Sequence, residues 1–439
     1  MRAPAVLILS VHCFWLAVTG PAGLTPAGAI GCRTACMCWT SMMVLCCRGG
    51  LPVPRTLPLL LPLRLRGGAP RSMASTTGPA ESIPRGRGLP RWGAGQQDNV
   101  KRLFVDPQCG RDDGGDGSAD KPYASIFAAV AHAVSSHKAA EILLAPRREY
   151  SGPRNRRISV ALAPGQHLSF AATGEGAVLD CGGTGFLLNV TSGGRGAEQR
   201  LAGLTLQNGK SGLLVGGSVT VRARACILHN FSSSAMSVSQ RARLDLDRCC
   251  FHNNLLNIPE RHAGSARGAV SLWERMGAAL AARGRVRLRI TDCNFRGNGG
   301  DGCVAGGAVA LGTQHRKALP GQLSFVGCEF AGNVAGDAGG ALALFNSSCV
   351  NLTNCVFRNN TAWGLCRGGG ALYTQALSAP RGGISWVYGC LFAGNRCPDN
   401  SDPPGGLTGG GGIAQVGHGT LSTRYTRQRD RWMDRWVDG

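Results

Sequence analysis

Two acidic side chains, Asp245 and Asp247, lie two residues apart in the segment RLDLD. Side chains two apart on a strand point to the same side, so both carboxylates are expected on one surface. A carboxylate pair of this kind serves as acid and base in the cleavage of glycosidic bonds, or binds Ca²⁺. Arg222, Arg224 and Arg289 occupy equivalent places in similar segments, where a guanidinium group is suited to bind a substrate carboxylate. The candidate catalytic residues are therefore Asp245, Asp247, Arg222 and Arg289.

A structural role fits the same residues. If the similar segments stack as neighbouring parallel strands, Arg222, Asp245 and Arg289 follow one another at one position, so that opposite charges alternate. Cross-strand pairs of opposite charge stabilise a sheet. Because alternation alone explains the two acids, we favour this charge ladder and keep catalysis as the alternative.

Two aromatic residues, Trp386 and Tyr388, occupy the same two outward positions in a later segment. Exposed aromatic rings can stack on sugar rings, which makes this pair the candidate carbohydrate-binding site; the alternative is that they cover the last coil. His229 and His252 also share one repeated position and are expected to stack. Two imidazoles alone rarely hold a metal, so the sequence indicates no metal site.

The element that must position these residues is a repeat of the form C-x-F-x-x-N. Five copies occur without error, and a degenerate copy with Leu228 in the place of Phe begins at Cys226. The five copies are Cys249/Phe251/Asn254, Cys293/Phe295/Asn298, Cys328/Phe330/Asn333, Cys355/Phe357/Asn360 and Cys390/Phe392/Asn395. The six copies start 23, 44, 35, 27 and 35 residues apart, which indicates one coil per copy with loops of different length.

Two further features define the coil. Apolar residues precede each Cys at positions −5 and −3, whereas the Cys and the Phe have the other parity, so a bend is expected just before the Cys. Between copies stands GGA-[VLI] or a close variant, at 268–270, 306–309, 339–342, 369–372 and 410–413. Two strands around a bend and a third after the glycines predict a three-sided coil, with Cys and Phe stacked inward and each Asn in a turn.

The repeats follow a differently built segment. RLFVD at 102–106 predicts a short strand, and the polar loop after it contains four aspartates that we interpret as a turn. Apolar residues then recur at helical spacing in YASIFAAVAHAV, which predicts a short capping helix. These apolar residues are Ile126, Ala129, Val130 and Ala133.

These features together carry a family resemblance. The opening FVDPQCGRDDGGDGSADKPYASIFAAVAHAV, the segments VLDCGGTGFLLNV and LAGLTLQNG, and the alternation of F-x-x-N with GGA-[VLI] resemble right-handed parallel β-helix proteins of the pectin-lyase-like superfamily. The repeat is similar to that of the polymorphic outer-membrane protein adhesins. The resemblance covers residues 102–418 and implies an all-β solenoid with a short N-terminal capping helix. It is weak for activity, because this fold hosts lyases, hydrolases, adhesins and inert scaffolds.

The N-terminal residues predict export. Met1 and Arg2 precede an apolar run and an Ala-x-Ala step, so residues 1–29 are interpreted as a secretory signal peptide. No later stretch is apolar enough to anchor the mature chain, which is expected to be secreted or at the cell surface. Removal of the signal would leave 18 cysteines, an even number that permits disulfide bonds. Five glycosylation acceptors agree with this route: Asn189, Asn230, Asn346, Asn351 and Asn359.

Composition separates the flanking segments from the repeats. Residues 30–101 are rich in Arg, Pro and Gly without periodicity and are expected to form a disordered leader or linker, and residues 419–439 a basic tail. The net charge is +22, but residues 30–102 alone carry 11 Lys and Arg against 2 acids. Because much of the basic excess lies in this leader, no nucleic-acid partner is expected.

The residues and the resemblance together imply a β-helix scaffold, adhesin-like or polysaccharide-binding, whose partner is a polysaccharide or a cell-surface glycan. The signatures of polygalacturonases and pectate lyases are absent, and no cofactor is expected. The alternative is a polysaccharide lyase or glycoside hydrolase that acts on uronate-containing polymers through Asp245, Asp247 and neighbouring arginines, with Ca²⁺ as the possible cofactor of a lyase.

Overall fold

The computed structural model describes residues 100–174, 176–256, 275–300, 302–312, 322–345, 349–363, 368–376, 384–397, 411–417, 420–424 and 427–428. The predicted signal peptide, nearly all of the predicted leader and the acceptor Asn346 lie outside these residues. Within them, the chain winds repeatedly through three sheets whose neighbouring strands are parallel.

Each of the three large sheets takes one strand from almost every coil. Sheet A contains, in spatial order, β1 (Lys101–Val105), β2 (Ala139–Leu144), β5 (His167–Ala172), β8 (Glu198–Ala202), β11 (Thr220–Arg224), β14 (Arg243–Asp247), β17 (Arg287–Thr291), β20 (Gln322–Val326), β24 (Cys349–Thr353), β28 (Ile384–Tyr388) and β31 (Thr420–Arg424). Sheet B contains β3 (Glu149–Tyr150), β6 (Ala177–Asp180), β9 (Leu204–Gly209), β12 (Ile227–Phe231), β15 (Cys250–His252), β18 (Asn294–Arg296), β21 (Glu329–Ala331), β25 (Val356–Arg358), β29 (Leu391–Ala393) and β32 (Arg427–Gln428). Sheet C contains β4 (Ile158–Leu162), β7 (Phe186–Ser192), β10 (Ser211–Gly217), β13 (Met236–Gln240), β16 (Leu280–Gly284), β19 (Val309–Gly312), β23 (Leu342–Phe345), β27 (Leu372–Ala376) and β30 (Ile413–Gly417). A separate two-stranded sheet pairs β22 (Val334–Ala335) with β26 (Thr361–Ala362).

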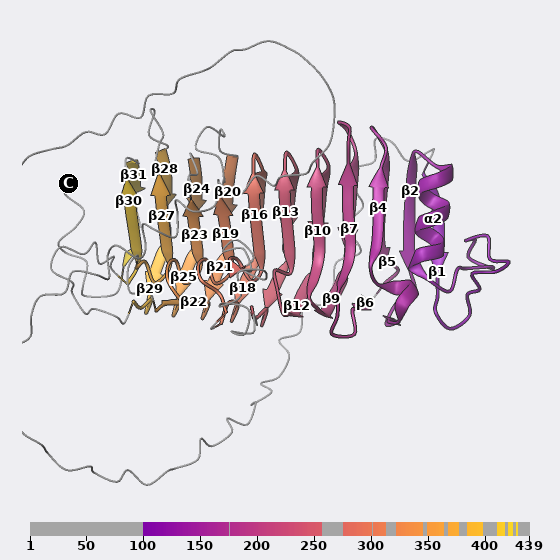
Figure 1. Ribbon diagram of the computed structural model, residues 1–439, viewed down its shortest axis with the longest axis horizontal. Coiled ribbons are helices and arrows are strands. Elements are labelled where there is room, and N and C mark those ends of the chain that lie inside the picture. Colours follow the sequence, from indigo (N-terminus) through magenta and orange to yellow (C-terminus); the bar gives the residue numbers. More distant parts are fainter. Residues whose placement is uncertain are drawn as a thin grey trace, which may run out of the picture. The chain divides into compact units, whose positions relative to one another are not determined.

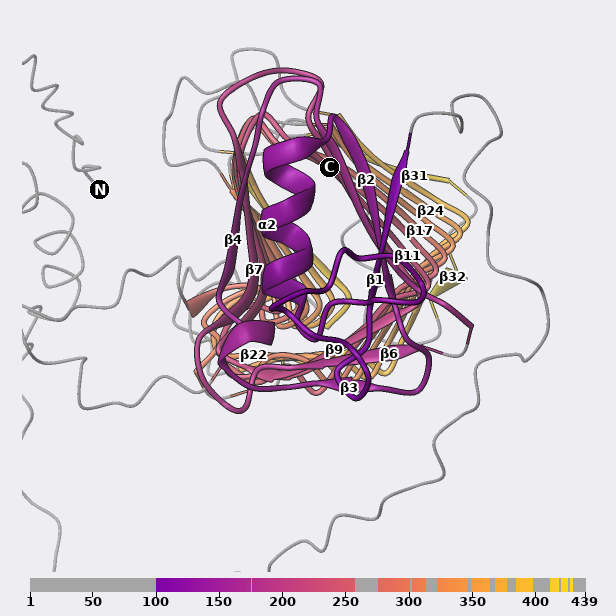
Figure 2. The ribbon, with the colours of Figure 1, turned by 90° about the vertical axis from the view of Figure 1, so that its right-hand side faces the viewer.

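A coil passes from sheet C through sheet A to sheet B, and the next coil repeats this path one strand further along the stack (Figure 1). Figure 2 looks along the stack and shows the three sheets as the sides of a triangle. The parallel β-helix predicted from the repeat is confirmed. Its strands continue to Gln428, so β31 and β32 lie beyond residue 418, within the residues that the sequence analysis gives to a basic tail.

The predicted bend between sheets A and B is made by one left-handed residue per coil. Arg248 (φ 50°) stands between β14 and Cys249, and Asp292 (φ 51°) and Gly327 (φ 63°) occupy the same place on the next two coils. Such a residue turns the chain and shifts the strand alternation by one position. Leu246 before the bend and Cys249 after it therefore both point into the core.

The phenylalanines of the repeat stack inside sheet B. The ring centroids of Phe295 and Phe330 are 4.8 Å apart, those of Phe330 and Phe357 are 4.7 Å apart, and the ring planes differ by 5° and 1°. Phe251 and Phe392 extend the column at its two ends. These distances match the spacing of neighbouring strands, because the in-register pairing places each ring over the next. The predicted inward ladder is confirmed.

The repeat cysteines form a second inward column, but no disulfide joins the described cysteines. The backbone N–H of Cys249 donates to Sγ of Cys293 at 3.3 Å. The hydrogen bond with Cys249 and then burial raise the pKa of the Cys226 thiol. The described repeat cysteines are all unbridged, so the expectation of disulfide bonds is not met within the described part of the chain.

The asparagines of the repeat form a buried amide ladder. Nδ2 of Asn333 donates to Oδ1 of Asn360 at 2.9 Å and to the carbonyl oxygen of Phe295 at 3.0 Å. Its own Oδ1 accepts from Nδ2 and the backbone N–H of Asn298, both at 3.0 Å. The left-handed residue of this turn is the one before the ladder asparagine, as at Asn359 (φ 54°). The repeated Asn therefore satisfies the polar groups of the turn, while its predecessor makes the turn.

The two glycines of GGA-[VLI] have different roles. The first, such as Gly306 (φ 62°), adopts a left-handed conformation before the strand of sheet C. The second lies against the next coil: a Cβ on Gly307 would be 2.2 Å from the carbonyl oxygen of Gly340, and a Cβ on Gly340 would be 2.2 Å from that of Gly370. Only glycine fits at both places.

One end of the stack is closed by the predicted helix, α2 (Ile126–Ser136), together with a 3₁₀ turn, η2 (Pro153–Asn155) (Figure 2). The four apolar residues expected on its inner face are its buried residues. Ser125 caps the helix by accepting from the N–H of Ala128 at 3.3 Å. Asn155 holds the first turn, since its Oδ1 accepts from the N–H of Ile126 at 2.8 Å.

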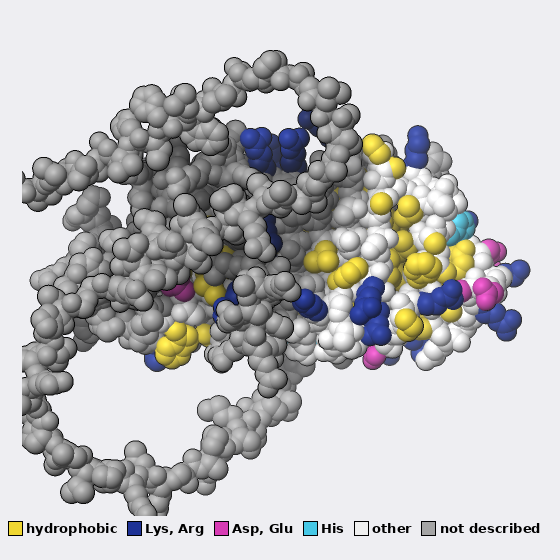
Figure 3. Space-filling model, viewed as in Figure 1, with side chains coloured by type: hydrophobic (Ala, Val, Ile, Leu, Met, Phe, Trp, Pro, Cys, Tyr) yellow, Lys and Arg dark blue, Asp and Glu magenta, His cyan; other side chains and the backbone are white. Residues whose placement is uncertain are grey.

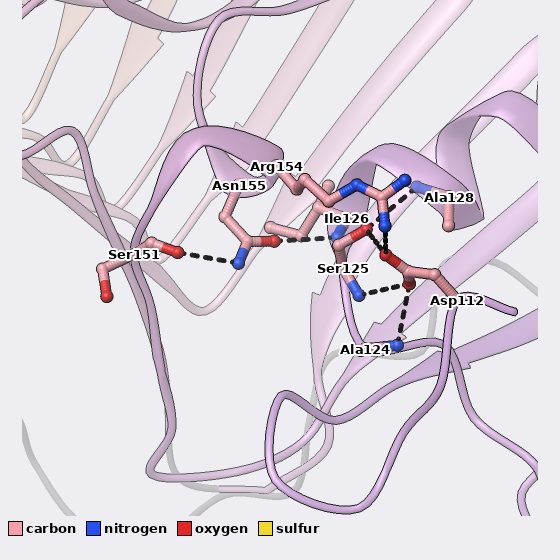
Figure 4. Close-up of polar contacts among 8 residues, drawn as sticks. All are labelled: Asp112, Ala124, Ser125, Ile126, Ala128, Ser151, Arg154 and Asn155. Carbon is pink, nitrogen blue, oxygen red and sulfur yellow. Dashed lines mark hydrogen bonds and ion pairs between the residues drawn. The ribbon is translucent and has the colours of Figure 1, made fainter.

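The aspartate-rich loop before α2 is tied to this cap through Asp112 (Figure 4). The Asp112 carboxylate accepts from the N–H groups of Ala124 and Ser125 at 3.1 and 2.9 Å, and from Oγ of Ser125 at 2.7 Å. Nη1 of Arg154 lies 2.7 Å from Oδ2 of Asp112. Both carboxylate oxygens of Asp112 are therefore used to hold the loop onto the helix, in agreement with the interpretation of this loop as a turn.

Candidate functional site

The outer face of sheet A carries all the candidate catalytic and aromatic residues. Arg222, Asp245 and Arg289 are register partners on β11, β14 and β17. The column continues through Ser324, Asn351 and Trp386. A second column, two residues further along each strand, contains Arg224, Asp247, Thr291, Val326, Thr353 and Tyr388. The order predicted from the offset to each Cys is therefore present in the fold.

Both candidate acids are paired with arginines. Oδ2 of Asp245 is 3.6 Å from Nε of Arg222, and Oδ1 of Asp245 is 3.1 Å from Nε of Arg243. Asp247 lies 3.0 Å from Nε of Arg224 and 3.3 Å from Nε of Arg248. The Arg222–Asp245 and Arg224–Asp247 contacts join neighbouring strands, as a charge ladder requires, whereas Arg243 and Arg248 contact the acids within the same coil. Among the described residues, no ion pair joins Asp245 to its other register partner, Arg289.

The centre of this ladder is Glu198 on β8, a residue that the sequence analysis did not identify. Its Oε1 lies 2.9 Å from Nε of Arg200 and 3.1 Å from Nε of Arg222, and His167 is 3.5 Å from Oε2. Burial disfavours the charged form, but the hydrogen bond from Arg200 and the charges of Arg200 and Arg222 lower the pKa of Glu198 below its ordinary value. The alternation E-x-R is the one signal in its segment, EQRLA, which lacks the Cys and Phe used to align the other copies.

Trp386 and Tyr388 project from β28 with 45% and 47% of their surfaces exposed. Asn351 and Thr353 on β24 are their register partners on one side. On the other side, β31 pairs with the whole of β28, so these aromatic residues do not belong to the last described strand of sheet A. They form an exposed apolar pair bordered by polar residues.

The described glycosylation acceptors occupy different environments. Asn351 is exposed on β24, and Asn230 and Asn359 are exposed left-handed residues at corners (φ 58° and 54°). Asn189 lies half-buried on β7. Asn351 and Thr353, which belong to one acceptor sequence, are the two residues beside Trp386 and Tyr388.

The two histidines expected to stack do so on sheet B. The rings of His229 and His252 are 4.7 Å apart and nearly parallel, at 7°. Burial lowers the pKa of both imidazoles. The next register partner in this column is Arg296 rather than a further ligand, so the stacked pair has no metal-binding partner on that side.

The sequence profile described as "Right handed beta helix region" matches residues 180–422, more than half of the chain. The chain belongs to the right-handed β-helix family. Among solved structures, this β-helix is similar to the GH136 lacto-N-biosidase from Eubacterium ramulus, with 10% identity and a TM-score of 0.37 over 75% of this chain and 68% of that one. It is also similar to a rhamnogalacturonan lyase, with 12% identity and a TM-score of 0.29 over 74% and 87% of the two chains. Likenesses this remote carry no argument about what the β-helix binds.

A search among curated proteins found no significant match to the β-helix chain. No helix in the described ranges is long and apolar enough to cross a membrane.

Proposed function

We propose that this β-helix is a secreted or cell-surface scaffold that binds a polysaccharide or a cell-surface glycan, in the manner of an adhesin. The binding residues are Trp386 and Tyr388 on the outer face of sheet A. The observation that carries the proposal is that both rings are about half exposed on one strand and point to the same side.

The surroundings of the aromatic pair suit a sugar. A pyranose ring presents an apolar face to an aromatic ring and hydroxyl groups at its edge. Thr353 stands one strand away, about 4.8 Å, where its hydroxyl can bond to those hydroxyl groups. Contiguous exposed apolar surface rimmed by polar residues marks binding sites, and the two rings lie together on one strand beside polar residues.

For Asp245 and Asp247 we propose a structural role in the charge ladder rather than general acid and base chemistry. Each carboxylate has two arginine partners within 3.6 Å. Arginines occupy both carboxylates, as a structural charge ladder requires, and the contact that joins neighbouring strands is present for each acid.

The test compares aromatic variants in a polysaccharide binding assay. The variant W386A/Y388A should bind its polysaccharide about tenfold or more weakly, since each ring contributes about 0.5–1.5 kcal/mol. The matched control is Trp363→Ala, because Trp363 is 53% exposed but lies outside sheet A, after β26. Equal losses in both variants would refute the site on β28.

The catalytic alternative is tested on the same polysaccharides. Reducing ends or unsaturated uronates should not be released, with or without Ca²⁺. Release that disappears in Asp245→Asn and Asp247→Asn would replace the scaffold by an enzyme.

The proposed export is tested by intact mass of the protein collected from the medium. The expected chain starts at residue 30, with added glycan mass at the acceptor asparagines. A chain that starts at residue 2 would contradict secretion through the predicted signal.

A further inference from the structure

Four arginines form a compact array where sheet C turns into sheet A on two successive coils. Arg243 on β14 and Arg287 on β17 are register partners. Gln240 pairs with Gly284, and the residues that follow this pair, Arg241 and Arg285, extend the array into the corner. All four are exposed, and Figure 3 shows Lys and Arg side chains gathered near the upper ends of β13 and β16. We call these four residues the arginine patch.

Most of the charge of the arginine patch is uncompensated within the described part of the chain. Within the described residues, Arg241, Arg285 and Arg287 have no ion-pair partner, and Asp245, the acid paired with Arg243, is shared with Arg222. Like charges directly opposite each other on neighbouring strands are destabilising. Sheet A places Asp245 and Asp247 opposite arginines, whereas Arg243 and Arg287, like Arg200 and Arg222 on β8 and β11, are two arginines opposite each other.

A departure from a local rule that costs stability is expected at a functional site. Neighbouring coils separate the two rows by about 4.8 Å. Guanidinium groups bind carboxylate and sulfate through paired hydrogen bonds. Four neighbouring guanidinium groups on two coils suit several anionic groups on one chain better than a single small anion.

We propose that the arginine patch binds an anionic polysaccharide whose carboxylate or sulfate groups face the four guanidinium groups. The choice of a polysaccharide over a nucleic acid rests on the proposed extracellular function. The patch and the aromatic pair are three strands apart on sheet A, from β17 to β28, so either site can fail without the other.

The experiment measures binding of the full chain to dextran sulfate, polygalacturonate, uncharged dextran and duplex DNA at low salt. The variant R285Q/R287Q should bind the two anionic polysaccharides about tenfold more weakly, at about threefold for each exposed ion pair. Its affinity should also depend less steeply on salt concentration, because fewer counterions are released. The matched control is Arg111→Gln, which removes an exposed arginine from the loop before α2. Comparison of dextran sulfate with polygalacturonate identifies whether sulfate or carboxylate groups are preferred.

A second measurement keeps the proposal falsifiable if the variant changes the fold. In the absence of polymer, R285Q/R287Q should unfold at the same temperature as the parent protein or a higher one, because a repulsive pair is removed. A clearly lower unfolding temperature would show that these arginines stabilise the coil and would overturn the proposal. Equal binding of uncharged dextran, tighter binding of DNA than of either polysaccharide, or an equal loss in Arg111→Gln would also overturn it. W386A/Y388A should keep its affinity for dextran sulfate, which separates this patch from the proposed function.

Discussion

The rings of Phe330 and Phe357 lie 4.7 Å apart with planes that differ by 1°, although 27 residues separate them in the chain. The contact exists because β21 and β25 pair in register, Phe330 opposite Phe357. Phe330 has a second stacked neighbour in Phe295 and an edge contact with Phe325. It is therefore enclosed by aromatic rings on three sides.

The loss of stability on truncating a phenylalanine should depend on its place in the ladder. Phe330→Ala should cost about 3–5 kcal/mol of unfolding free energy, because rings above and below prevent the cavity from collapsing. Phe392→Ala should cost clearly less, because Phe392 has one stacked ring in the described structure. The pair Phe330→Ala and Phe357→Ala should deviate from additivity, whereas the distant pair Phe251→Ala and Phe392→Ala should add. Denaturant unfolding of each variant tests this, and equal costs at Phe330 and Phe392 would contradict coil-upon-coil stacking.

The amide ladder makes a prediction that depends on pH. Asn333→Asp replaces the Nδ2 donor by an acceptor that faces Oδ1 of Asn360 and the carbonyl oxygen of Phe295. The buried carboxylate should cost about 3–5 kcal/mol at pH 7. Burial should raise the pKa of the new Asp, so the loss should shrink as the pH falls toward 4 and the proton restores one donor. Unfolding at both pH values measures this cost. The control is Asn359→Asp, which replaces an exposed asparagine on the next coil and should change stability little.

Alanine substitutions at two glycines separate the stability cost of a steric contact from that of a left-handed backbone conformation. Gly332 has a left-handed φ of 62° and open space around its Cβ position, so Gly332→Ala should cost about 1–2 kcal/mol. Gly340 has no such φ, but its Cβ would overlap the carbonyl oxygens of Gly370 and Thr361 at 2.2 and 2.5 Å. Gly340→Ala should therefore cost about 3 kcal/mol or more, or prevent folding. A smaller cost at Gly340 than at Gly332, measured by thermal or denaturant unfolding, would show that the coils can separate there.

Glu198 should stabilise the protein only in its ionised form. Its pKa is lowered in the fold, so its contribution is complete above the ordinary glutamate pKa of about 4.3 and is lost as the pH falls toward the lower folded value. Glu198→Gln should cost about 1.5–3 kcal/mol at pH 7 and much less near pH 3. The control is Glu141→Gln, whose partner Arg102 is 64% exposed and which should cost at most about 1 kcal/mol. A pH-independent cost at Glu198 would rule out the ionic explanation.

The offset of each residue from the repeat cysteine was enough to place the candidate site. Arg222, Asp245 and Arg289 lie at the same offset, and equal offsets become register partners once the coils stack. Glu198 escaped this reasoning because its coil has Leu204 where the other copies have Cys, so no motif aligned it. The sequence therefore predicted the positions of Arg222, Asp245 and Arg289 in the charge ladder. It did not predict Glu198 at its centre.

The sequence alone determined the periodic part of this protein, because a motif that recurs once per coil must stack on itself. It predicted the three-sided β-helix, the bend before each Cys, the inward phenylalanines and the helix whose buried residues include Ile126. Tertiary structure decided what periodicity leaves open. The stacked thiols of described cysteines such as Cys249 are unbridged, and the folding of neighbouring coils brings Glu198 within 3.1 Å of Arg222. These outcomes depend on distances between coils, which no spacing along the chain encodes.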